Sequence, residues 1–322
     1  MPNTSSDVGL ARVALSAIAQ APREQRGWRR LGQLVRAAVE SLRPYQWLKN
    51  ALVFVPLAAA HRLAELNLLG AAAKTFGAFS LCAAAVYLLN DLHDREEDLG
   101  HPHKRLRAIA SGRLPARWAW ALVPVLLVSS LGMAGSVNRA VVGTLAVYLL
   151  MTSLYTMCLK ALVLLDAFTL AAGYALRVLA GSLAVHIAPS PRLLAFCIFL
   201  FFSLALLKRY AELSLLRLRD GEAAKARAYQ RADAEFLLPL GVVCAGLSVL
   251  ILAEYLSSGL PQRRYSHAQL IWVTCVLLLY WNSYLWLMAH RGRMTDDPLV
   301  FAMTDRTSCV LVALMGVCAW AA

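Results

Sequence analysis

A dense cluster of acidic residues follows a long apolar stretch in the first third of the sequence. Residues 88–112 read LLNDLHDREEDLGHPHKRLRAIASG, and five of the eight residues from 91 to 98 are acidic. Asp91, Asp94 and Asp98 have the spacing that places side chains on one face of an α-helix. Like charges at this spacing repel, so a helix gains nothing from them without a cation. Because Mg²⁺ prefers oxygen ligands and commonly binds carboxylates together with phosphates, the cluster predicts a site for one or two Mg²⁺ ions that hold a diphosphate.

A solvated charge run at a helix end is the alternative interpretation, and it is the usual explanation for such a cluster. Glu96, Glu97 and Arg95 fit it well. The basic segment that follows, HPHKRLRAIASGRLP, favours the metal site for the three aspartates. A loop that mixes acids and bases can hold a metal-bound anion from both sides, so Lys104 and Arg105 are predicted to bind phosphate.

The segment RPYQWLKN, residues 43–50, again combines basic residues with an interfacial tryptophan at a helix entrance. Lys49 is predicted either to contact an anion or to snorkel at the membrane surface. The sequence leaves these two interpretations open.

The composition is that of a membrane protein. Hydrophobic residues make up 59% of the chain and charged residues 16%, and the mean hydropathy is +0.57. A soluble domain has about 45–50% apolar and about 25% charged residues. A helix needs roughly 20 apolar residues to cross a bilayer. Runs of about this length occur at 46–63, 68–90, 117–134, 139–159, 162–185, 192–213, 235–257, 267–289 and 301–321. We therefore predict an all-α, polytopic membrane bundle of about nine transmembrane helices, because a bilayer cannot hydrate loose backbone groups.

Basic residues are distributed unequally over the two sides of this predicted bundle. The N-terminal tail and the loops after the even-numbered spans hold 25 Lys and Arg residues, and the opposite side holds 6. The excess predicts a multi-pass protein of the cell (inner) membrane, with its N-terminus and acidic cluster in the cytoplasm. The net charge of +13 then faces anionic lipid or an anionic substrate, and nothing in the sequence indicates a nucleic-acid partner.

Two regions follow from this pattern. Residues 1–42 are predicted to form a cytoplasmic tail, in which the amphipathic, basic-flanked segment 31–42 is able to lie on the membrane surface. Residues 43–322 are predicted to form the transmembrane domain. In its fifth span, Asp166 and Arg177 lie eleven residues apart, about 16 Å along one face of a helix. Ionisable residues at membrane depth are costly and usually line a cavity, which we expect for Arg177, while a structural role remains equally open for Asp166.

The phrase NDLHDREEDLGHPHKRLRAIASG resembles the first aspartate-rich motif of the UbiA superfamily of intramembrane prenyltransferases. RPYQWLKN, HPHKRLRAIASG, YTMCLKALVLLD, GYALRVLAG and LLKRYAEL resemble one branch, the decaprenyl-phosphate phosphoribosyltransferases. The likeness extends over about residues 43–321. It implies a UbiA-like bundle of nine helices, with Mg²⁺ bound by Asp91, Asp94 and Asp98 and with Asn90 alongside. It also implies phosphoribosyl diphosphate as donor, a polyprenyl (decaprenyl) phosphate as acceptor, and a role in cell-envelope biosynthesis.

One region departs from the prenyltransferases of this superfamily, which typically carry a second aspartate-rich motif after the sixth helix. Here the region reads LLKRYAELSLLRLRDGEAAKARAY, with Lys208, Arg209, Tyr210 and Glu212 in place of an aspartate ladder. Cations suit a donor with an additional anionic group, such as a ribose 5-phosphate. Lys160, Lys208 and Arg209 are therefore predicted to bind phosphate, and Tyr210 and Glu212 to contact ribose hydroxyls or a metal-bound water.

In the phosphoribosyl interpretation, the departing diphosphate is neutralised by metal and cations while the lipid phosphate attacks the ribose carbon from the opposite face. The main alternative is a UbiA-type prenyltransferase that moves an isoprenoid from prenyl diphosphate to an aromatic or other acceptor. A transporter is a second alternative, but the sequence shows no internal repeat and its charges gather at one surface.

Overall fold

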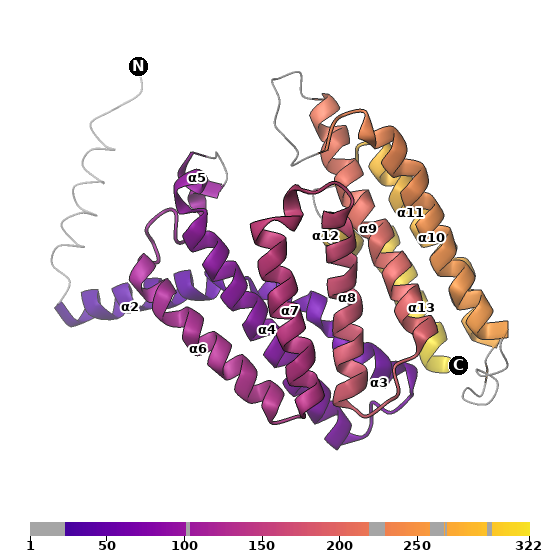
Figure 1. Ribbon diagram of the computed structural model, residues 1–322, viewed down its shortest axis with the longest axis horizontal. Helices are drawn as coiled ribbons and strands as arrows, with labels where there is room; N and C mark the ends of the chain where they lie inside the picture. The colour runs from indigo at the N-terminus through magenta and orange to yellow at the C-terminus, as the bar shows by residue number, and fades with distance from the viewer. Residues whose placement is uncertain (1–22, 101–103, 219–228, 258–266, 268, 295–297) are drawn as a thin grey trace, which may run out of the picture. The chain divides into compact units, whose positions relative to one another are not determined.

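The computed structural model describes residues 23–100, 104–218, 229–257, 267, 269–294 and 298–322 (Figure 1). All regular structure in this part of the chain is helical, which confirms the all-α prediction. The chain divides into two compact units, and each is described by itself. Unit 1 contains residues 1–45 and 87–126, and unit 2 contains residues 46–86 and 127–322. Of the predicted tail, residues 1–22 lie outside the described part.

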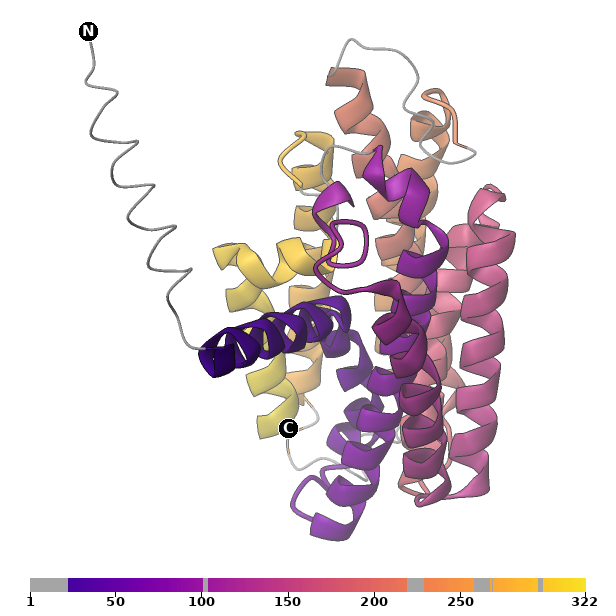
Figure 2. The same ribbon diagram turned by 90° about the vertical axis from the view of Figure 1, so that its left-hand side faces the viewer.

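Unit 1 holds the acidic cluster. Its elements are α2 (Arg23–Ser41), the last turns of α4 (Leu66–His93), α5 (Arg95–Leu99), the 3₁₀-helix η2 (Lys104–Leu106) and the first half of α6 (Ala116–Gly135). Figure 2 shows the end of α2 beside the segment that leads into α6. Glu40 of α2 and Arg113 of this segment form a two-pronged ion pair, with nitrogen–oxygen distances of 2.6 and 2.8 Å.

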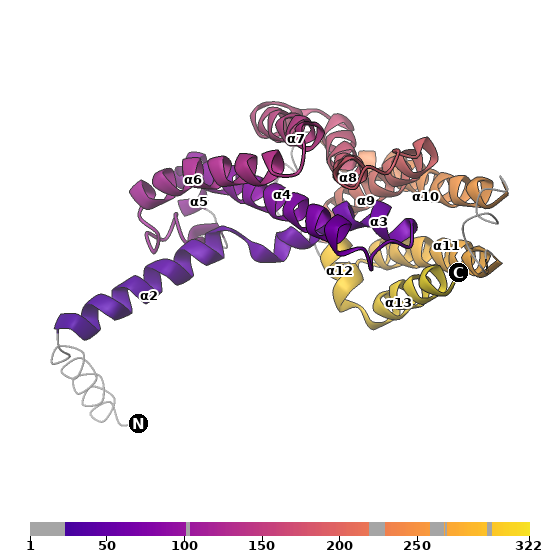
Figure 3. The same cartoon turned by 90° about the horizontal axis from the view of Figure 1, so that it is seen from below.

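Unit 2 holds the remaining helices. They are η1 (Pro44–Phe54, from Gln46 on), α3 (Val55–Ala59), the first part of α4, the end of α6, α7 (Arg139–Met157), η3 (Leu159–Ala161), α8 (Leu165–Ala184), α9 (Pro191–Leu218), α10 (Asp233–Ser257), α11 (Gln269–His290), α12 (Pro298–Thr304) and α13 (Arg306–Ala321). Successive helices from α7 to α11 pack against each other, as the views in Figures 1 and 3 show, and α13 packs on α11. The buried core is formed mainly by α8, α9, α10 and α11.

Seven described helices are long and apolar enough to cross a membrane: α4, α6, α7, α8, α9, α10 and α11. Each corresponds to one of the predicted runs, so the multi-pass architecture is confirmed. The last run, 301–321, is divided at Asp305, and the apolar helix that follows, α13, is shorter. Asp305 caps α13, because its carboxylate accepts a hydrogen bond of 2.8 Å from the backbone N–H of Ser308.

The first predicted run, 46–63, differs from a continuous membrane helix. It forms most of η1, the five-residue helix α3 and a turn. The reason lies in its polar opening. The side-chain amide of Asn50 is buried, donates to the hydroxyl of Ser80 at 3.0 Å and accepts from the guanidinium of Arg177 at 2.6 Å. These bonds attach η1 to α4 and α8, where a lipid-facing helix would leave the amide without partners.

Gly181 allows η1 to lie directly against α8. A Cβ atom at this position would overlap the carbonyl oxygen of Val53 and lie 2.8 Å from its carbonyl carbon. We expect Gly181→Ala to lower the free energy of unfolding by about 1–3 kcal/mol or more, because a backbone atom cannot rotate away as a side chain can. The comparison is made by SDS titration of the protein in mixed micelles.

Gly246→Ala in α10 is the matched control, since a Cβ atom added there would have no other atom within 4 Å. At this position we expect a gain of about 0.5–1 kcal/mol from helix propensity. Equal effects of the two substitutions would contradict the close approach of Val53 to Gly181.

Candidate functional site

Two of the three predicted aspartates converge on one arginine in unit 1. Nη1 of Arg107 lies 3.1 Å from Oδ1 of Asp91 and 2.7 Å from Oδ2 of Asp98. The backbone supports this arrangement, because the N–H of Asp98 bonds to the carbonyl of Asp94 at 2.8 Å and helical pairing continues past the end of α4. Asp91 and Asp98 are 4% and 1% exposed. Of the three aspartates that the spacing places on one helix face, Asp91 and Asp98 both reach Arg107.

Arg43 is the second cation in this group. Its Nη2 lies 2.6 Å from Oδ1 of Asp91, and its guanidinium carbon lies 5.0 Å from the ring centre of Tyr87. Arg43 adopts a positive φ of 51°, an unusual conformation for a non-glycine residue, directly after α2. The two carboxylates of Asp91 and Asp98 are thus balanced by the two guanidinium groups of Arg43 and Arg107, as two largely buried acids require.

The other predicted residues of unit 1 lie around this pairing. Asp94 is half-buried and stands between α4 and α5, outside the pairing with Arg107. Asn90 is half-buried on α4, and its carbonyl accepts from the N–H of Asp94 at 2.8 Å. Lys104 and Arg105 are exposed in η2. The basic segment therefore contributes Arg107 to the carboxylates, and the phosphate contacts predicted for Lys104 and Arg105 stay predictions.

Unit 2 contains a separate buried cluster around Arg209 of α9, which is 2% exposed. Its Nε lies 2.6 Å from Oδ2 of Asp166 at the start of α8, and its Nη1 lies 2.6 Å from Oε2 of Glu212. Its Nη2 lies 3.5 Å from the hydroxyl of Tyr155. Two acids and one cation leave this group with a formal charge of −1. The guanidinium is enclosed and bonded on all three nitrogens. Its predicted contact with phosphate stays a prediction.

Tyr229 completes the cluster. Its hydroxyl donates to Oδ1 of Asp166 at 2.6 Å and accepts from the backbone N–H of Leu164 at 2.9 Å. Leu164 has a positive φ of 64°, so this bond supports a strained turn before α8. Burial raises the pKa of Tyr229, and its bond to Asp166 acts in the same direction. The phenol therefore stays protonated and keeps donating to the carboxylate.

Arg177 occupies a third polar group, in the middle of α8. It donates to Asn50, to the carbonyl of Gly173 at 2.6 Å and to the hydroxyl of Tyr148 at 3.1 Å. Its guanidinium carbon also lies 4.7 Å and 5.6 Å from the ring centres of Tyr148 and Tyr174. These partners are neutral, and the aromatic faces partly replace a carboxylate. The group joins η1, α7 and α8, so Arg177 holds three elements together, and its predicted cavity role stays a prediction.

The remaining predicted residues of unit 2 are placed as follows. Lys49, Lys160 and Lys208 are half-buried on η1, η3 and α9. Tyr210 is buried, and its hydroxyl lies 3.0 Å from Nδ1 of His290. Its hydrogen bond joins α9 to the end of α11.

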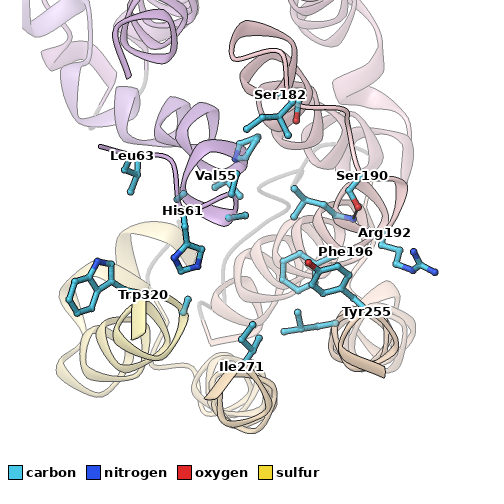
Figure 4. A pocket seen from close by; sticks show the side chains of 18 of the residues that line it. Val55, His61, Leu63, Ser182, Ser190, Arg192, Phe196, Tyr255, Ile271 and Trp320 are labelled. Carbon is cyan, nitrogen blue, oxygen red and sulfur yellow. Dashed lines mark hydrogen bonds between the residues drawn. The ribbon is translucent and has the colours of Figure 1, made fainter. Parts of the chain in front are cut away.

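A cavity of about 870 Å³ is lined by residues from the start of α9, the end of α10 and the start of α11 (Figure 4). Phe196, Tyr255 and Ile271 contribute to its mainly apolar wall, while Arg192 points away from it and pairs with Glu254 at 2.8 Å. Arg192 precedes Arg209 by 17 residues of α9, which is about 26 Å of helix. The cavity wall contains no residue that the sequence predicted for the site.

Comparison with known proteins identifies the family. The sequence matches the model of the UbiA prenyltransferase family over residues 51–303. The chain belongs to the UbiA prenyltransferase family. It is 35% identical to the nodulation protein NoeC of Azorhizobium caulinodans, over 86% of this chain and 89% of that protein. It is 34% identical to the uncharacterized protein y4nM of Sinorhizobium fredii over 87% of its own length, and it spans 55% of that longer protein.

This UbiA-family transferase also resembles proteins of named activity. It is 35% identical to the decaprenyl-phosphate phosphoribosyltransferase of Mycolicibacterium smegmatis, over 66% of this chain and 70% of that protein. Among solved structures, a UbiA homolog from Archaeoglobus fulgidus bound to GPP and Mg²⁺ superimposes with a TM-score of 0.63 at 16% identity, over 89% of this chain and 100% of that chain. That likeness confirms the UbiA-like fold.

The donor chemistry of the acidic cluster in this UbiA-family chain fits Mg²⁺. Asp91 and Asp98 turn carboxylate oxygens toward one positive group, and Mg²⁺ commonly binds one or two carboxylates. In the described part of the chain, however, no three His, Cys, Asp or Glu side chains converge closely enough to hold a metal ion. Arg107 takes the position between the two acids. A metal ion bound there would replace this guanidinium, and the three-aspartate site stays a prediction.

Arg43, Arg107 and Tyr229 were not predicted as members of these clusters. In the sequence, Arg43 and Arg107 are only two of several cations in the basic segments. They lie 48 and 16 residues from Asp91, so the spacing of neighbours on a helix does not pair them with it. Tyr229 lies 63 residues from Asp166. A single sequence contains no signal for such a pair. Asp166 was a visible candidate, because a carboxylate at the start of an apolar run requires a partner.

Proposed function

We propose that this UbiA-family protein is a Mg²⁺-dependent membrane transferase that moves a 5-phosphoribosyl group from phosphoribosyl diphosphate to a polyprenyl phosphate. The observation that carries the proposal is the 35% identity to the decaprenyl-phosphate phosphoribosyltransferase of Mycolicibacterium smegmatis over 66% of this chain. Phrases on both sides of the acidic cluster resemble the same branch. In the reaction, the bond between ribose C1 and the diphosphate breaks, and a bond between C1 and a lipid phosphate oxygen forms. Diphosphate leaves with the bonding electron pair.

The acidic cluster of unit 1 supports the diphosphate part of the proposal. Asp91, Asp94 and Asp98 would hold Mg²⁺, which when bound supplies positive charge for the departing diphosphate. Lys104 and Arg105 are exposed nearby in sequence and are proposed to contact phosphate oxygens. Arg43 and Arg107 balance the carboxylates until metal and substrate arrive. Asn90, one residue before Asp91, is proposed to help orient the three aspartates.

The Arg209 cluster of unit 2 supports the choice of donor. Where typical prenyltransferases of the superfamily carry a second aspartate-rich motif, Arg209 here pairs with both Asp166 and Glu212. A group of charged and polar side chains suits a polar donor such as phosphoribosyl diphosphate better than the apolar chain of a prenyl diphosphate. Lys49, Lys160, Lys208 and Arg209 are proposed to bind phosphate. Tyr210 and Glu212 are proposed to contact ribose hydroxyls or a metal-bound water, and Arg177 to line the donor cavity.

A comparison of donors tests the proposal. Purified protein with Mg²⁺ is supplied either with phosphoribosyl diphosphate and polyprenyl phosphate, or with a prenyl diphosphate and an aromatic acid. We expect phosphoribosyl polyprenyl phosphate and diphosphate from the first pair and no product from the second. Product from the second pair alone would replace this proposal with a prenyltransferase.

The same assay in sealed membranes tests the proposed orientation, which rests on the excess of basic residues on one side. Phosphoribosyl diphosphate does not cross a bilayer. We therefore expect product from inside-out vesicles and not from right-side-out vesicles, if the acidic cluster faces the cytoplasm. The reverse result would place the cluster on the opposite surface.

A further inference from the structure

Helix α2 in unit 1 has an apolar face that no described part of the protein covers. Ala37 and Ser41, four residues apart, are 2% and 5% exposed and form the side that packs against the protein. Leu31, Val35 and Val39 repeat at the same interval but are 51%, 55% and 49% exposed. Because the spacing of three to four residues defines a helix face, these residues form a continuous exposed apolar stripe on a second face.

The rest of α2 is basic. The helix contains five arginines and two glutamates, and Arg36 is exposed. Helical register places position 36 about 100° from position 35, at the edge of the stripe. One of the glutamates, Glu40, is already paired with Arg113. An apolar stripe with Arg36 at its edge, on a helix of net charge +3, matches an anionic lipid surface, where apolar side chains enter the acyl boundary and cations meet phosphate groups.

A second observation places the end of α2 at the membrane boundary. The ion pair of Glu40 with Arg113 ties α2 to the chain three residues before α6 begins, and α6 is one of the helices able to cross a membrane. In its first turns, Trp118 and Trp120 are 51% and 59% exposed. Exposed tryptophans at the end of a membrane helix mark the interface between lipid and water. The end of α2 is therefore attached at the level where head groups lie.

We propose that α2 lies on the bilayer and binds anionic lipid, with Leu31, Val35 and Val39 in the acyl boundary and Arg36 at the head-group phosphates. A second copy of the chain fits this face less well. Three side chains offer far less than the roughly 800 Å² per partner of a stable interface, and two copies of a helix with a net charge of +3 repel each other.

An environment-sensitive fluorophore on the full-length chain tests this arrangement. It is attached to Val35→Cys or, as the matched control, to Gln33→Cys, which is also exposed but lies on the charged side of the helix. The exposed Cys158 and Cys309 and the half-exposed Cys318 are first replaced by serine. The protein is reconstituted in vesicles of phosphatidylcholine, with or without phosphatidylglycerol.

We expect the label at position 35 to emit at shorter wavelength and to be quenched by lipid-borne quenchers, more strongly when phosphatidylglycerol is present. The label at position 33 should respond to water-soluble quenchers instead. Arg36→Gln should lower the ratio of docked to undocked α2 on the order of fivefold at low salt. The proposal would be overturned if both labels emitted as in water and responded equally to water-soluble quenchers. It would also be overturned if position 35 were shielded from those quenchers by a second copy of the chain, detected by cross-linking.

Discussion

Replacing Asp91 by alanine is expected to reduce the rate of transfer about a hundredfold or more. The carboxylate is 4% exposed and is shared by Arg43 and Arg107, so its loss leaves two cations facing the single carboxylate of Asp98. If Asp91 also holds Mg²⁺, the leaving diphosphate loses charge stabilisation, and a single such group is commonly worth about 10²–10³ in rate. Initial rates over a series of Mg²⁺ concentrations provide the measurement.

Glu97→Ala is the matched control. Glu97 lies in the same acidic cluster, but its side chain is exposed and points to no partner that the structure describes. We expect a change of about twofold or less, which is typical of a surface substitution. A full Mg²⁺-dependent rate in Asp91→Ala, or an equal loss in Glu97→Ala, would show that Asp91 is not a metal ligand.

Arg107 distinguishes a metal site from a purely structural salt bridge. Because its guanidinium lies between Asp91 and Asp98, Arg107→Gln should remove a competitor and increase the thermal stabilisation that Mg²⁺ gives to the protein. Asp91→Ala should diminish the same stabilisation. This readout requires no substrate. If Mg²⁺ has the same effect on the parent and on both variants, the carboxylates serve only to bind the arginines.

Asp166→Asn is expected to have the largest effect on stability, a loss of about 3–5 kcal/mol. Asp166 is fully buried, and its carboxylate accepts from Arg209 at 2.6 Å, from Tyr229 at 2.6 Å and from the N–H of Ala167 at 2.7 Å. An amide cannot replace the charge that balances Arg209, and its NH₂ group would face a donor. The free energy of unfolding is measured by SDS titration in mixed micelles.

Glu254→Gln gives a direct comparison, because it breaks the exposed pair of Arg192 and Glu254 in the same unit. An exposed ion pair contributes about 0–1 kcal/mol, since water and salt screen both partners. The buried pair should therefore exceed the exposed pair severalfold. If the two variants unfold at the same SDS concentration, the Arg209 cluster is not what holds α8 and α9 together.

Features that depend on short stretches of chain could be predicted from the sequence alone. A membrane helix needs only about 20 consecutive apolar residues, so α4 and α6 to α11 were predictable one at a time. Helical spacing likewise predicted one face for Asp91, Asp94 and Asp98, and of these Asp91 and Asp98 both contact Arg107. The cap that Asp305 provides to α13 is also local, because donor and acceptor are three residues apart.

Contacts between residues far apart in the sequence became visible only in the three-dimensional structure. The run 46–63 is apolar enough to suggest a membrane helix, yet Asn50 bonds to Arg177, 127 residues away, and Gly181 admits the backbone of Val53. Arg107 reaches Asp91 and Asp98, and Arg209 is enclosed with Asp166 and Glu212. Such pairs follow from how helices pack, and the spacing of residues along the chain carries information on a single helix only.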